Sequence, residues 1–182
     1  IQAVYNLADQ VVVMTDHALC EMAEIYRVNR KKIIKIPNPA ILDRRSNTNK
    51  PWIYGDKTVI CVGRLEDVKQ QDIAIRAFSI VVEQVKEARM LILGEGPRKR
   101  YLESLIRKMR LQDKVCLLGF QKDVTYFLEH SRVFLMTSKT EGFPNGMIEA
   151  MAAGLPVVSI ASSGAPQEIL GCMKQAEDRA IM

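Results

Sequence analysis

The sequence predicts an α/β fold in which a parallel sheet carries helices on both faces. Short apolar, β-branched runs alternate along the chain with longer stretches whose apolar residues recur at the period of a helix. This alternation is typical of strand–helix–strand units, because parallel strands need long crossover connections. With 182 residues, of which 48% are hydrophobic, the chain is long enough to bury one ordinary globular core.

The first part of the chain predicts a single strand–helix–strand unit. Residues 11–15 and 33–36 are short β-branched runs, and residues 16–26 between them predict a helix. Residues 43–56 follow with a polar run, Arg44-Arg45-Ser46-Asn47-Thr48-Asn49-Lys50-Pro51, that has no hydrophobic period. This segment therefore predicts a linker or long surface loop, with a domain boundary inside it.

The rest of the chain predicts a larger set of alternating strands and helices. Pro97 is expected to open one of these helices, and Gly154 is expected to close another as a C-cap. The predicted strands are residues 58–62, 89–93, 115–118, 133–137 and 156–160, and the predicted helices are residues 70–86, 97–109, 124–130, 146–153 and 166–170.

Cysteine usage and hydropathy bear on the compartment. The cysteines at 20, 61, 116 and 172 form no Cys-x-x-Cys pair, and Cys61 and Cys116 lie in apolar runs. Buried thiols are therefore expected rather than disulfides or zinc ligands, which favours a reducing cytosol. No apolar run approaches the roughly 20 residues that a helix needs to span a bilayer. The chain begins at Ile1 with no basic-plus-apolar leader, so we expect a piece of a longer protein.

The charge is mildly basic, with 26 Lys and Arg against 21 Asp and Glu and a net charge of +5. A nucleic-acid partner is not expected, since the basic clusters have almost none of the interleaved aromatic residues that stack on bases. Solvated helix and loop faces explain these clusters best, and a peripheral contact with an anionic membrane surface is the weaker alternative. His17 and His130 have no partner cluster and are expected at the surface.

Two glutamates bracket the segment with the strongest functional signal. Glu141 is expected on a loop after the strand at 133–137, and Glu149 about one turn into the next helix. Backbone N–H groups near a helix N-terminus favour phosphate, and a carboxylate can accept two hydrogen bonds from a vicinal diol. This pattern predicts a nucleotide-sugar site, the alternative being that both glutamates cap a helix or face solvent. The residues between them are Gly142, Phe143, Pro144, Asn145, Gly146, Met147 and Ile148.

A second phosphate-handling element follows the strand at 58–62. Gly63, Arg64 and Lys69 come directly after it and before a predicted helix. A leaving diphosphate needs positive groups fixed in place, whereas the alternative is an exposed pair of cations at a helix start. The run Leu93-Gly94-Glu95-Gly96-Pro97 is a weak dinucleotide signal because the third glycine is absent. Asp-x-Asp is absent too, so no metal and no cofactor is implied.

Together these motifs resemble the donor-binding half of retaining GT-B glycosyltransferases of family 4, which have Rossmann-like domains. The resemblance implies that Glu149 holds the ribose, that Glu141 contacts the transferred sugar, and that Arg64 and Lys69 are catalytic through the diphosphate. The rest of the Glu141–Glu149 loop and Gly63 would contact the donor. Leu118-Gly119-Phe120 resembles the element that contacts the base, so Phe120 and Gln121 are base-site candidates, with plain packing as the alternative.

The resemblance also divides the chain. Residues 1–42 are expected to end an acceptor domain, residues 43–56 to form the linker, and residues 57–182 to form a C-terminally truncated donor domain. Two positions depart from the family pattern: Gln70 and Pro39 stand where glycine is usual. A side chain at Gln70 is expected to narrow the approach of the backbone to phosphate.

The activity implied is transfer of a sugar from a nucleoside diphosphate donor to an acceptor hydroxyl with retention of configuration. A UDP-sugar is favoured over GDP-mannose, and a glycan or lipid-linked acceptor in bacterial surface polysaccharide synthesis is expected. The expected location is the cytoplasm or the inner face of the membrane. The alternative is a nucleotide-sugar binding module without catalysis, as this chain would be on its own. A phosphorylase or an epimerase fits less well, because the residues that either would need are not found.

Overall fold

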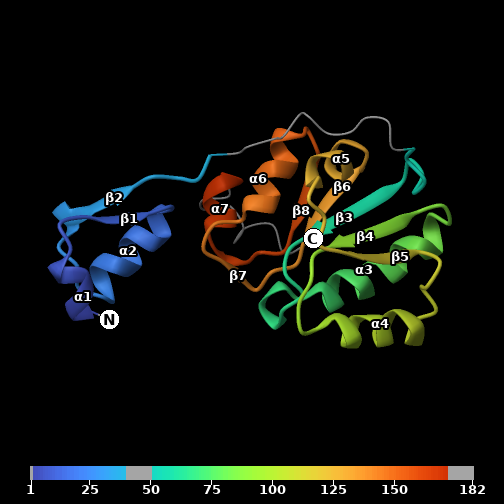
Figure 1. Cartoon of the computed structure of the whole chain (residues 1–182), viewed down its shortest axis with the longest axis horizontal. Helices are drawn as coiled ribbons and strands as arrows, with labels where there is room; N and C mark the ends of the chain where they lie inside the picture. The colour runs from blue at the N-terminus through green and yellow to red at the C-terminus, as the bar shows by residue number, and fades with distance from the viewer. Residues whose placement is uncertain (1, 40–50, 172–182) are drawn as a thin grey trace, which may run out of the picture. The chain divides into compact units, whose positions relative to one another are not determined.

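The computed structural model describes residues 2–39 and 51–171 (Figure 1). These residues form two compact units, and each is considered by itself. The first contains residues 2–39, 140–144 and 161–171, and the second contains residues 51–139 and 145–160. This grouping differs from the limits expected from the sequence, because two short segments beyond residue 57 pack with the first unit. The division into acceptor and donor domains stays a prediction.

The second unit is built on a parallel five-stranded sheet with the order β5-β4-β3-β6-β8. Strands β3 and β4 pair from Thr58↔Arg89 to Val62↔Leu93. The predicted α/β class is thereby confirmed, and all the predicted strands form, some of them shorter than expected. Their bounds are β3 (Thr58–Val62), β4 (Arg89–Leu93), β5 (Val115–Gly119), β6 (Val133–Met136) and β8 (Val157–Ser159).

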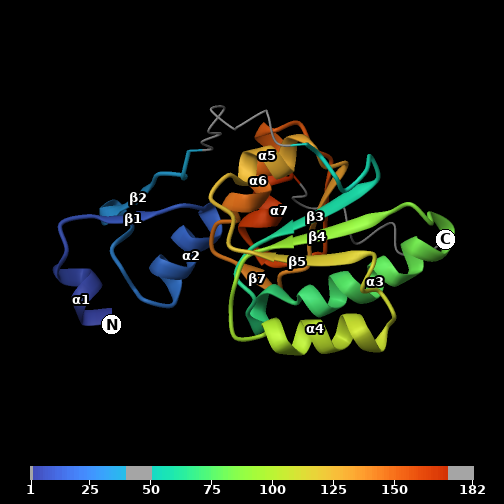
Figure 2. The same cartoon turned by 45° about the vertical axis from the view of Figure 1, so that its right-hand side comes forward.

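Helices cover both faces of this sheet. Figures 1 and 2 show α3 (Gln71–Gln84) and α4 (Lys99–Lys108) on one face, and α5 (Val124–Glu129) and α6 (Asn145–Ala152) on the other. Between the sheet and the first pair lies the main core, where Phe78, Met90 and Leu102 are fully buried. Each such side chain contributes about 1.5–3 kcal/mol to the free energy of unfolding. This core fixes the strands whose ends carry the predicted site.

The first unit contains a smaller sheet and a second strand pair. Strand β1 pairs in parallel with β2, and the Thr15 hydroxyl caps α2 by accepting from the Ala18 N–H at 3.1 Å. Lys35 lies 2.7 Å from Asp16 and 2.5 Å from Glu168, and these hydrogen bonds raise the pKa of Lys35. The elements are α1 (Gln2–Leu7), β1 (Val11–Val13), α2 (Asp16–Glu24), η1 (Arg30–Lys32), β2 (Ile33–Lys35), β7 (Thr140–Glu141), β9 (Ser163–Gly164) and α7 (Ala165–Ile169).

One local expectation was wrong, and another holds only in part. Helix α4 begins at Lys99, so Pro97 lies in the preceding turn; the Arg98 N–H donates to the Leu65 carbonyl and holds that turn outside the helix. His130 is exposed, as expected, but it has ring partners: it stacks on Trp52 at a centroid distance of 5.2 Å and lies against Tyr126. Residue 52 belongs to the predicted linker, whose described end therefore packs on α5. Pro39, the other departure from the family pattern, is among the described residues, whereas residues 43–50 of the predicted linker lie outside them.

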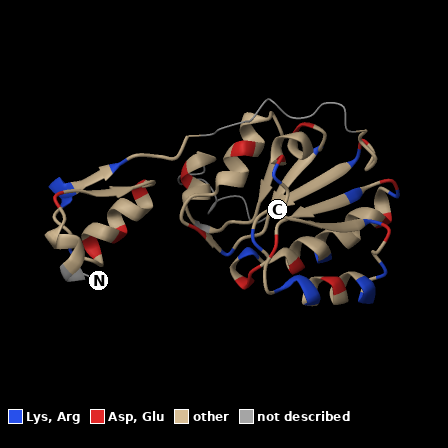
Figure 3. Cartoon of the chain, in the orientation of Figure 1, with Lys and Arg blue, Asp and Glu red and all other residues tan. Residues whose placement is uncertain are grey.

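The basic residues are exposed as expected, whereas the expected burial of the cysteines is confirmed only in part. The basic residues Lys99, Arg100, Arg107 and Lys108 line the exposed side of α4 (Figure 3). Cys61 is buried, which raises its thiol pKa to about 12, whereas Cys116 is half-buried and Cys20 is exposed. Within the described residues, every helix is too short or too polar to cross a bilayer.

Candidate functional site

The predicted cations lie where the strand order of the large sheet reverses. From β3 the chain moves outward to β4 and β5, and it then returns to β6 and β8 on the other side of β3. In open parallel sheets ligands bind outside the carboxyl ends of the strands at such a switch point. Gly63 and Arg64 directly follow the carboxyl end of β3, and Thr137 follows that of β6. The topology thus supports a ligand site at the edge chosen by the sequence motifs.

Glycines let the loops at this edge approach one another closely. The Gly63 N–H donates to the Leu93 carbonyl at 3.0 Å, and the Gly94 N–H donates to the Gly119 carbonyl at 2.8 Å. A Cβ on Gly94 would lie 2.0 Å from the Gly63 carbonyl oxygen, and one on Gly96 would lie 2.4 Å from the Leu65 oxygen. Both glycines also have positive φ angles, 133° and 159°. Side chains are excluded here by the opposing backbone, so these glycines shape the loop that carries Arg64.

The two predicted cations sit on one loop but in different surroundings. The side chain of Arg64 is 77% exposed, and its Nη1 lies 2.8 Å from Glu66 Oε1. Lys69 is half-buried and ends the single turn η2 (Asp67–Lys69). A Cβ placed on Gly63 would lie 3.7 Å from Lys69 Cδ and Cε, so the lysine stem passes beside Gly63. The structure therefore brings Lys69 to the glycine that precedes Arg64.

Gln70, one of the departures from the family pattern, has a left-handed backbone, with φ 47° and ψ 41°. This conformation explains why glycine suits the position, since a Cβ costs about 1–2 kcal/mol there. Gln70 both ends η2 and precedes α3. The residue thus stores backbone strain inside the loop that carries the two cations.

Replacing Gln70 by glycine is expected to raise the free energy of unfolding by up to about 1 kcal/mol. Relief of the left-handed strain exceeds the extra entropy that glycine gives the unfolded chain. Urea unfolding of Gln70→Gly and Gln70→Ala measures this, because alanine keeps the Cβ and gives no such gain. Equal midpoints for the two variants would contradict the assignment of strain to this residue.

Helix α6 places the second predicted carboxylate as expected. Glu149 is one turn into the helix and half-buried, and desolvation raises its pKa above the ordinary value of 4.5. At the start of the helix, a Cβ on Gly146 would lie 3.5 Å from the Val62 carbonyl oxygen, so α6 begins beside the end of β3. The exposed Asn145 begins the helix, whereas the Met147 side chain is fully buried. Met147 can therefore face a ligand only through its backbone.

The loop with the first glutamate differs from the expectation. Glu141 lies in the two-residue strand β7, where it pairs with Gly164 of β9. A Cβ on Gly164 would lie 2.4 Å from the Glu141 carbonyl oxygen, so this pairing needs glycine. Of the following donor-site candidates, Gly142 is exposed, Phe143 is half-buried and Pro144 is buried. Residues 141–144 group with the first compact unit, and residues 145–149 group with the second.

The two base-site candidates follow β5 at the same edge of the sheet as Gly63. Phe120 is 74% exposed, which leaves its ring available for stacking. Gln121 is half-buried, and its Nε2 donates to the Leu118 carbonyl at 2.7 Å, which closes the turn after β5. Phe120 is therefore the better placed of the two to contact a base, and Gln121 also shapes the turn.

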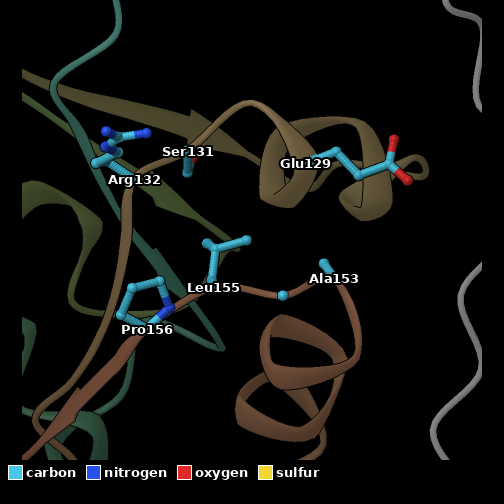
Figure 4. Close-up of a pocket in the computed structure, with 7 residues that line it drawn as sticks. Glu129, Ser131, Arg132, Ala153, Leu155 and Pro156 are labelled. Atoms are coloured by element: carbon cyan, nitrogen blue, oxygen red, sulfur yellow. The ribbon is translucent and has the colours of Figure 1, made fainter.

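A pocket at the opposite edge of the sheet involves none of these residues (Figure 4). Its walls come from the segment before β6, with Ser131 and Arg132, and from the segment before β8, with Leu155 and Pro156. Both segments precede their strands, so the pocket lies at the amino ends. Ligands of open parallel sheets bind at the other edge. This pocket is consequently separate from the predicted donor site.

A family model described as glycosyl transferases group 1 matches residues 43–174. An uncharacterized glycosyltransferase of Methanocaldococcus jannaschii is 37% identical over 174 residues, covering 91% of this chain and 43% of the relative. A Campylobacter jejuni N-acetylgalactosaminyltransferase named for a diphospho-undecaprenol substrate is 29% identical, covering 94% of this chain and 46% of the relative.

Among solved structures, S. aureus TarM has the same fold with a TM-score of 0.78 and 26% identity. The match covers 92% of this chain and 33% of TarM, which was crystallised as a mutant with fondaparinux, α-GlcNAc-glycerol and UDP. The chain thus spans less than half the length of the relatives that it matches.

Proposed function

The chain belongs to the group 1 glycosyl transferase family, and on this basis we propose that it provides the donor site of a retaining enzyme that uses a nucleoside diphosphate sugar. The observation that carries the proposal is the arrangement at one sheet edge. Arg64 and Lys69 follow β3, and the N-terminus of α6 begins beside Val62 at the end of the same strand. Two cations and a helix N-terminus at the switch point suit a diphosphate.

Each candidate residue receives a role in this proposal. Glu149 holds the ribose hydroxyls, Glu141 contacts the transferred sugar, and Phe120 with Gln121 borders the base. When the bond between sugar and diphosphate breaks, negative charge grows on the leaving phosphate, and Arg64 and Lys69 stabilise it. A phosphate oxygen of the leaving group helps to deprotonate the acceptor hydroxyl. The remaining contacts to the donor come from Gly63, Gly142, Phe143, Pro144, Asn145, Gly146 and the backbone of Met147.

The preferred donor in this proposal is a UDP-sugar, ahead of GDP-mannose, and no metal takes part. The UDP in the TarM complex supports the choice of base. The C. jejuni relative, named for a diphospho-undecaprenol substrate, supports a lipid-linked or glycan acceptor. We place the reaction in the cytoplasm or at the inner membrane face. The three described cysteines are free thiols, which suits a reducing compartment.

The alternative is nucleotide-sugar binding without transfer by this chain on its own. It is favoured by the extent of the chain, which covers 43% of the M. jannaschii relative. Transfer would then require the full-length protein, whereas nucleotide binding would not. Measuring UDP binding, and UDP release from UDP-sugars, for both this chain and the full-length protein separates binding from transfer.

Glu149→Ala is expected to weaken nucleotide binding by about 1–3 kcal/mol, because it removes hydrogen bonds to a charged acceptor. Calorimetric titration of the chain with UDP, GDP and ADP measures this and identifies the base. Glu129→Ala is the control, since this exposed glutamate borders the pocket at the opposite sheet edge. If wild type binds a nucleotide and Glu149→Ala binds it equally well, the role given to Glu149 is wrong.

Glu149→Gln separates lost binding from misfolding. Because burial raises the pKa of Glu149, the folded chain binds this proton more tightly than the unfolded chain does. The free energy of unfolding therefore falls as pH rises from the ordinary value of 4.5 through the raised pKa. At neutral pH Glu149→Gln should be more stable than wild type, an advantage lost in acid, while its nucleotide affinity is lower. Chemical unfolding at neutral and acidic pH measures this difference.

A further inference from the structure

Two buried polar side chains hold the backbone of the loop that carries Arg64 and Lys69. Gln71 and Thr137 are each only 5% exposed. The Gln71 Nε2 donates to the Arg64 carbonyl at 2.9 Å. The Thr137 hydroxyl is within donating distance of two backbone carbonyls, that of Gln70 at 2.9 Å and that of Lys69 at 3.1 Å. One side chain thus anchors each end of the loop.

We propose that Gln71 and Thr137 are positioning residues for the donor diphosphate, holding Arg64 and Lys69 where charge grows during transfer. The inference rests on the proposed donor site and adds residues that no sequence motif indicated. Neither side chain needs to contact the donor. Both act through the backbone of the residues that do.

Backbone hydrogen bonds fix the middle of the loop, where the Leu65 N–H donates to the Glu95 carbonyl at 2.8 Å and the Lys139 N–H donates to the Val68 carbonyl at 2.8 Å, whereas Gln71 and Thr137 act at its two ends. Gly63 and Gln70 both have positive φ angles, 155° and 47°, and only the single turn η2 lies between them. Arg64 is mostly exposed, so packing does not fix its side chain. Electrostatic stabilisation of a transition state depends on charges that are already in place before reaction. The backbone that carries Arg64 and Lys69 must therefore be held in place by hydrogen bonds from the rest of the fold.

The state of Gln71 indicates a functional rather than a stabilising role. Its orientation is set by the Arg64 carbonyl, which can only accept, so the amide nitrogen faces the loop. Its Oε1 is buried and has no hydrogen-bond partner among the described residues. An unpaired buried acceptor destabilises a fold, and an apolar side chain of similar shape would avoid that cost. A glutamine at this buried position therefore indicates a role other than stabilising the fold.

The contacts that remain after substitution make a clean test possible. The Arg64 carbonyl also accepts from the Glu66 N–H at 2.9 Å, and the Gln70 carbonyl also accepts from the Ile73 N–H at 2.9 Å. Removing the amide in Gln71→Met or the hydroxyl in Thr137→Val therefore leaves the Arg64 and Gln70 carbonyls with a partner. Thr137→Ser keeps the hydroxyl and is the matched control. The loop should loosen without unfolding of the sheet.

The experiment uses the full-length protein and measures UDP release from UDP-sugars, or GDP release from GDP-mannose, together with binding of the free nucleoside. Gln71→Met and Thr137→Val should lower kcat at least 10-fold, leave KM within threefold, and leave nucleoside affinity unchanged. Thermal unfolding midpoints should stay within about 4 °C of wild type, the shift that a change of about 1 kcal/mol produces. Thr137→Ser should keep kcat within threefold of wild type.

Four results would overturn the inference. They are unchanged kcat in Gln71→Met and Thr137→Val, a rise in KM alone, a Thr137→Ser variant as slow as Thr137→Val, and a loss of nucleoside affinity equal to the loss in kcat. In each of these cases wild type still releases the nucleotide, so the proposed function stands. If wild type neither binds a nucleoside diphosphate nor releases one from any sugar donor, the proposed function fails, and the inference fails with it.

Discussion

Lys69→Ala should lower kcat for release of UDP from a UDP-sugar about 100-fold in the full-length protein, which corresponds to about 3 kcal/mol in the barrier. This is the size of effect expected when an enzyme loses one fixed donor that stabilises a developing negative charge. Lys69 is half-buried, and the end of its aliphatic stem lies beside Gly63 at the start of the loop. Steady-state kinetics should show the loss in kcat, with nucleotide binding retained.

Lys86→Ala is the matched control for Lys69→Ala. Lys86 is exposed and lies between α3 and β4, at the amino edge of the sheet, away from the predicted site. It should keep wild-type kcat. Arg64→Ala should behave like Lys69→Ala, because both cations face the same developing charge in the proposal. If the Lys69→Ala variant releases UDP at the wild-type rate, the role proposed for Lys69 is wrong.

Gly94→Ala should destabilise the second unit by about 3 kcal/mol or more. Positive φ alone costs about 1–2 kcal/mol for a residue with a Cβ. The larger part comes from a Cβ that would lie 2.0 Å from the Gly63 carbonyl oxygen, a distance that only backbone movement can relieve. Because Gly63 precedes Arg64, nucleotide affinity should fall too. Urea unfolding followed by circular dichroism, with UDP titration, measures both effects.

Two further glycine variants separate the clash from the backbone conformation. A Cβ on Gly55 meets nothing within 4 Å, but Gly55 has a φ of 80°, so Gly55→Ala reports strain alone. Gly142 has neither a positive φ nor a neighbour within 4 Å, so alanine there should change stability by less than about 0.5 kcal/mol. If Gly94→Ala costs no more than Gly55→Ala, the loops do not approach as closely as described.

Most of the second unit could be predicted because its signals are local. Strands β3 and β4 form over the predicted residues, since each has a four-residue apolar run between a polar residue and a glycine, which leaves little choice of boundary. Glu149 lies one turn into α6 because the preceding glycines and proline restrict where that helix can begin. The positions of Gly63, Arg64 and Lys69 after β3 follow directly from the strand boundary.

Other features depend on contacts between segments that are distant in sequence. Strands β7 and β9 have only two residues each, too short for any periodic signal, and they exist because Thr140 pairs with Ser163 and Glu141 with Gly164. The left-handed Gln70 was not expected either; the Thr137 hydroxyl, far along the chain, accounts for how that turn is held. No sequence motif indicated the anchoring role of Gln71, since glutamine near a helix start has many uses.

The sequence by itself determined the α/β class, the order of strands and helices, and the residue types able to handle a diphosphate. Those properties come from local periodicity and from the chemistry of individual side chains. Tertiary structure alone decided that Gly94 must lack a side chain, that Lys69 passes beside Gly63, and that Gln71 and Thr137 anchor the loop. The physical reason is that steric exclusion, burial and hydrogen bonding depend on distances between atoms, and distances between remote residues exist only after the chain has folded.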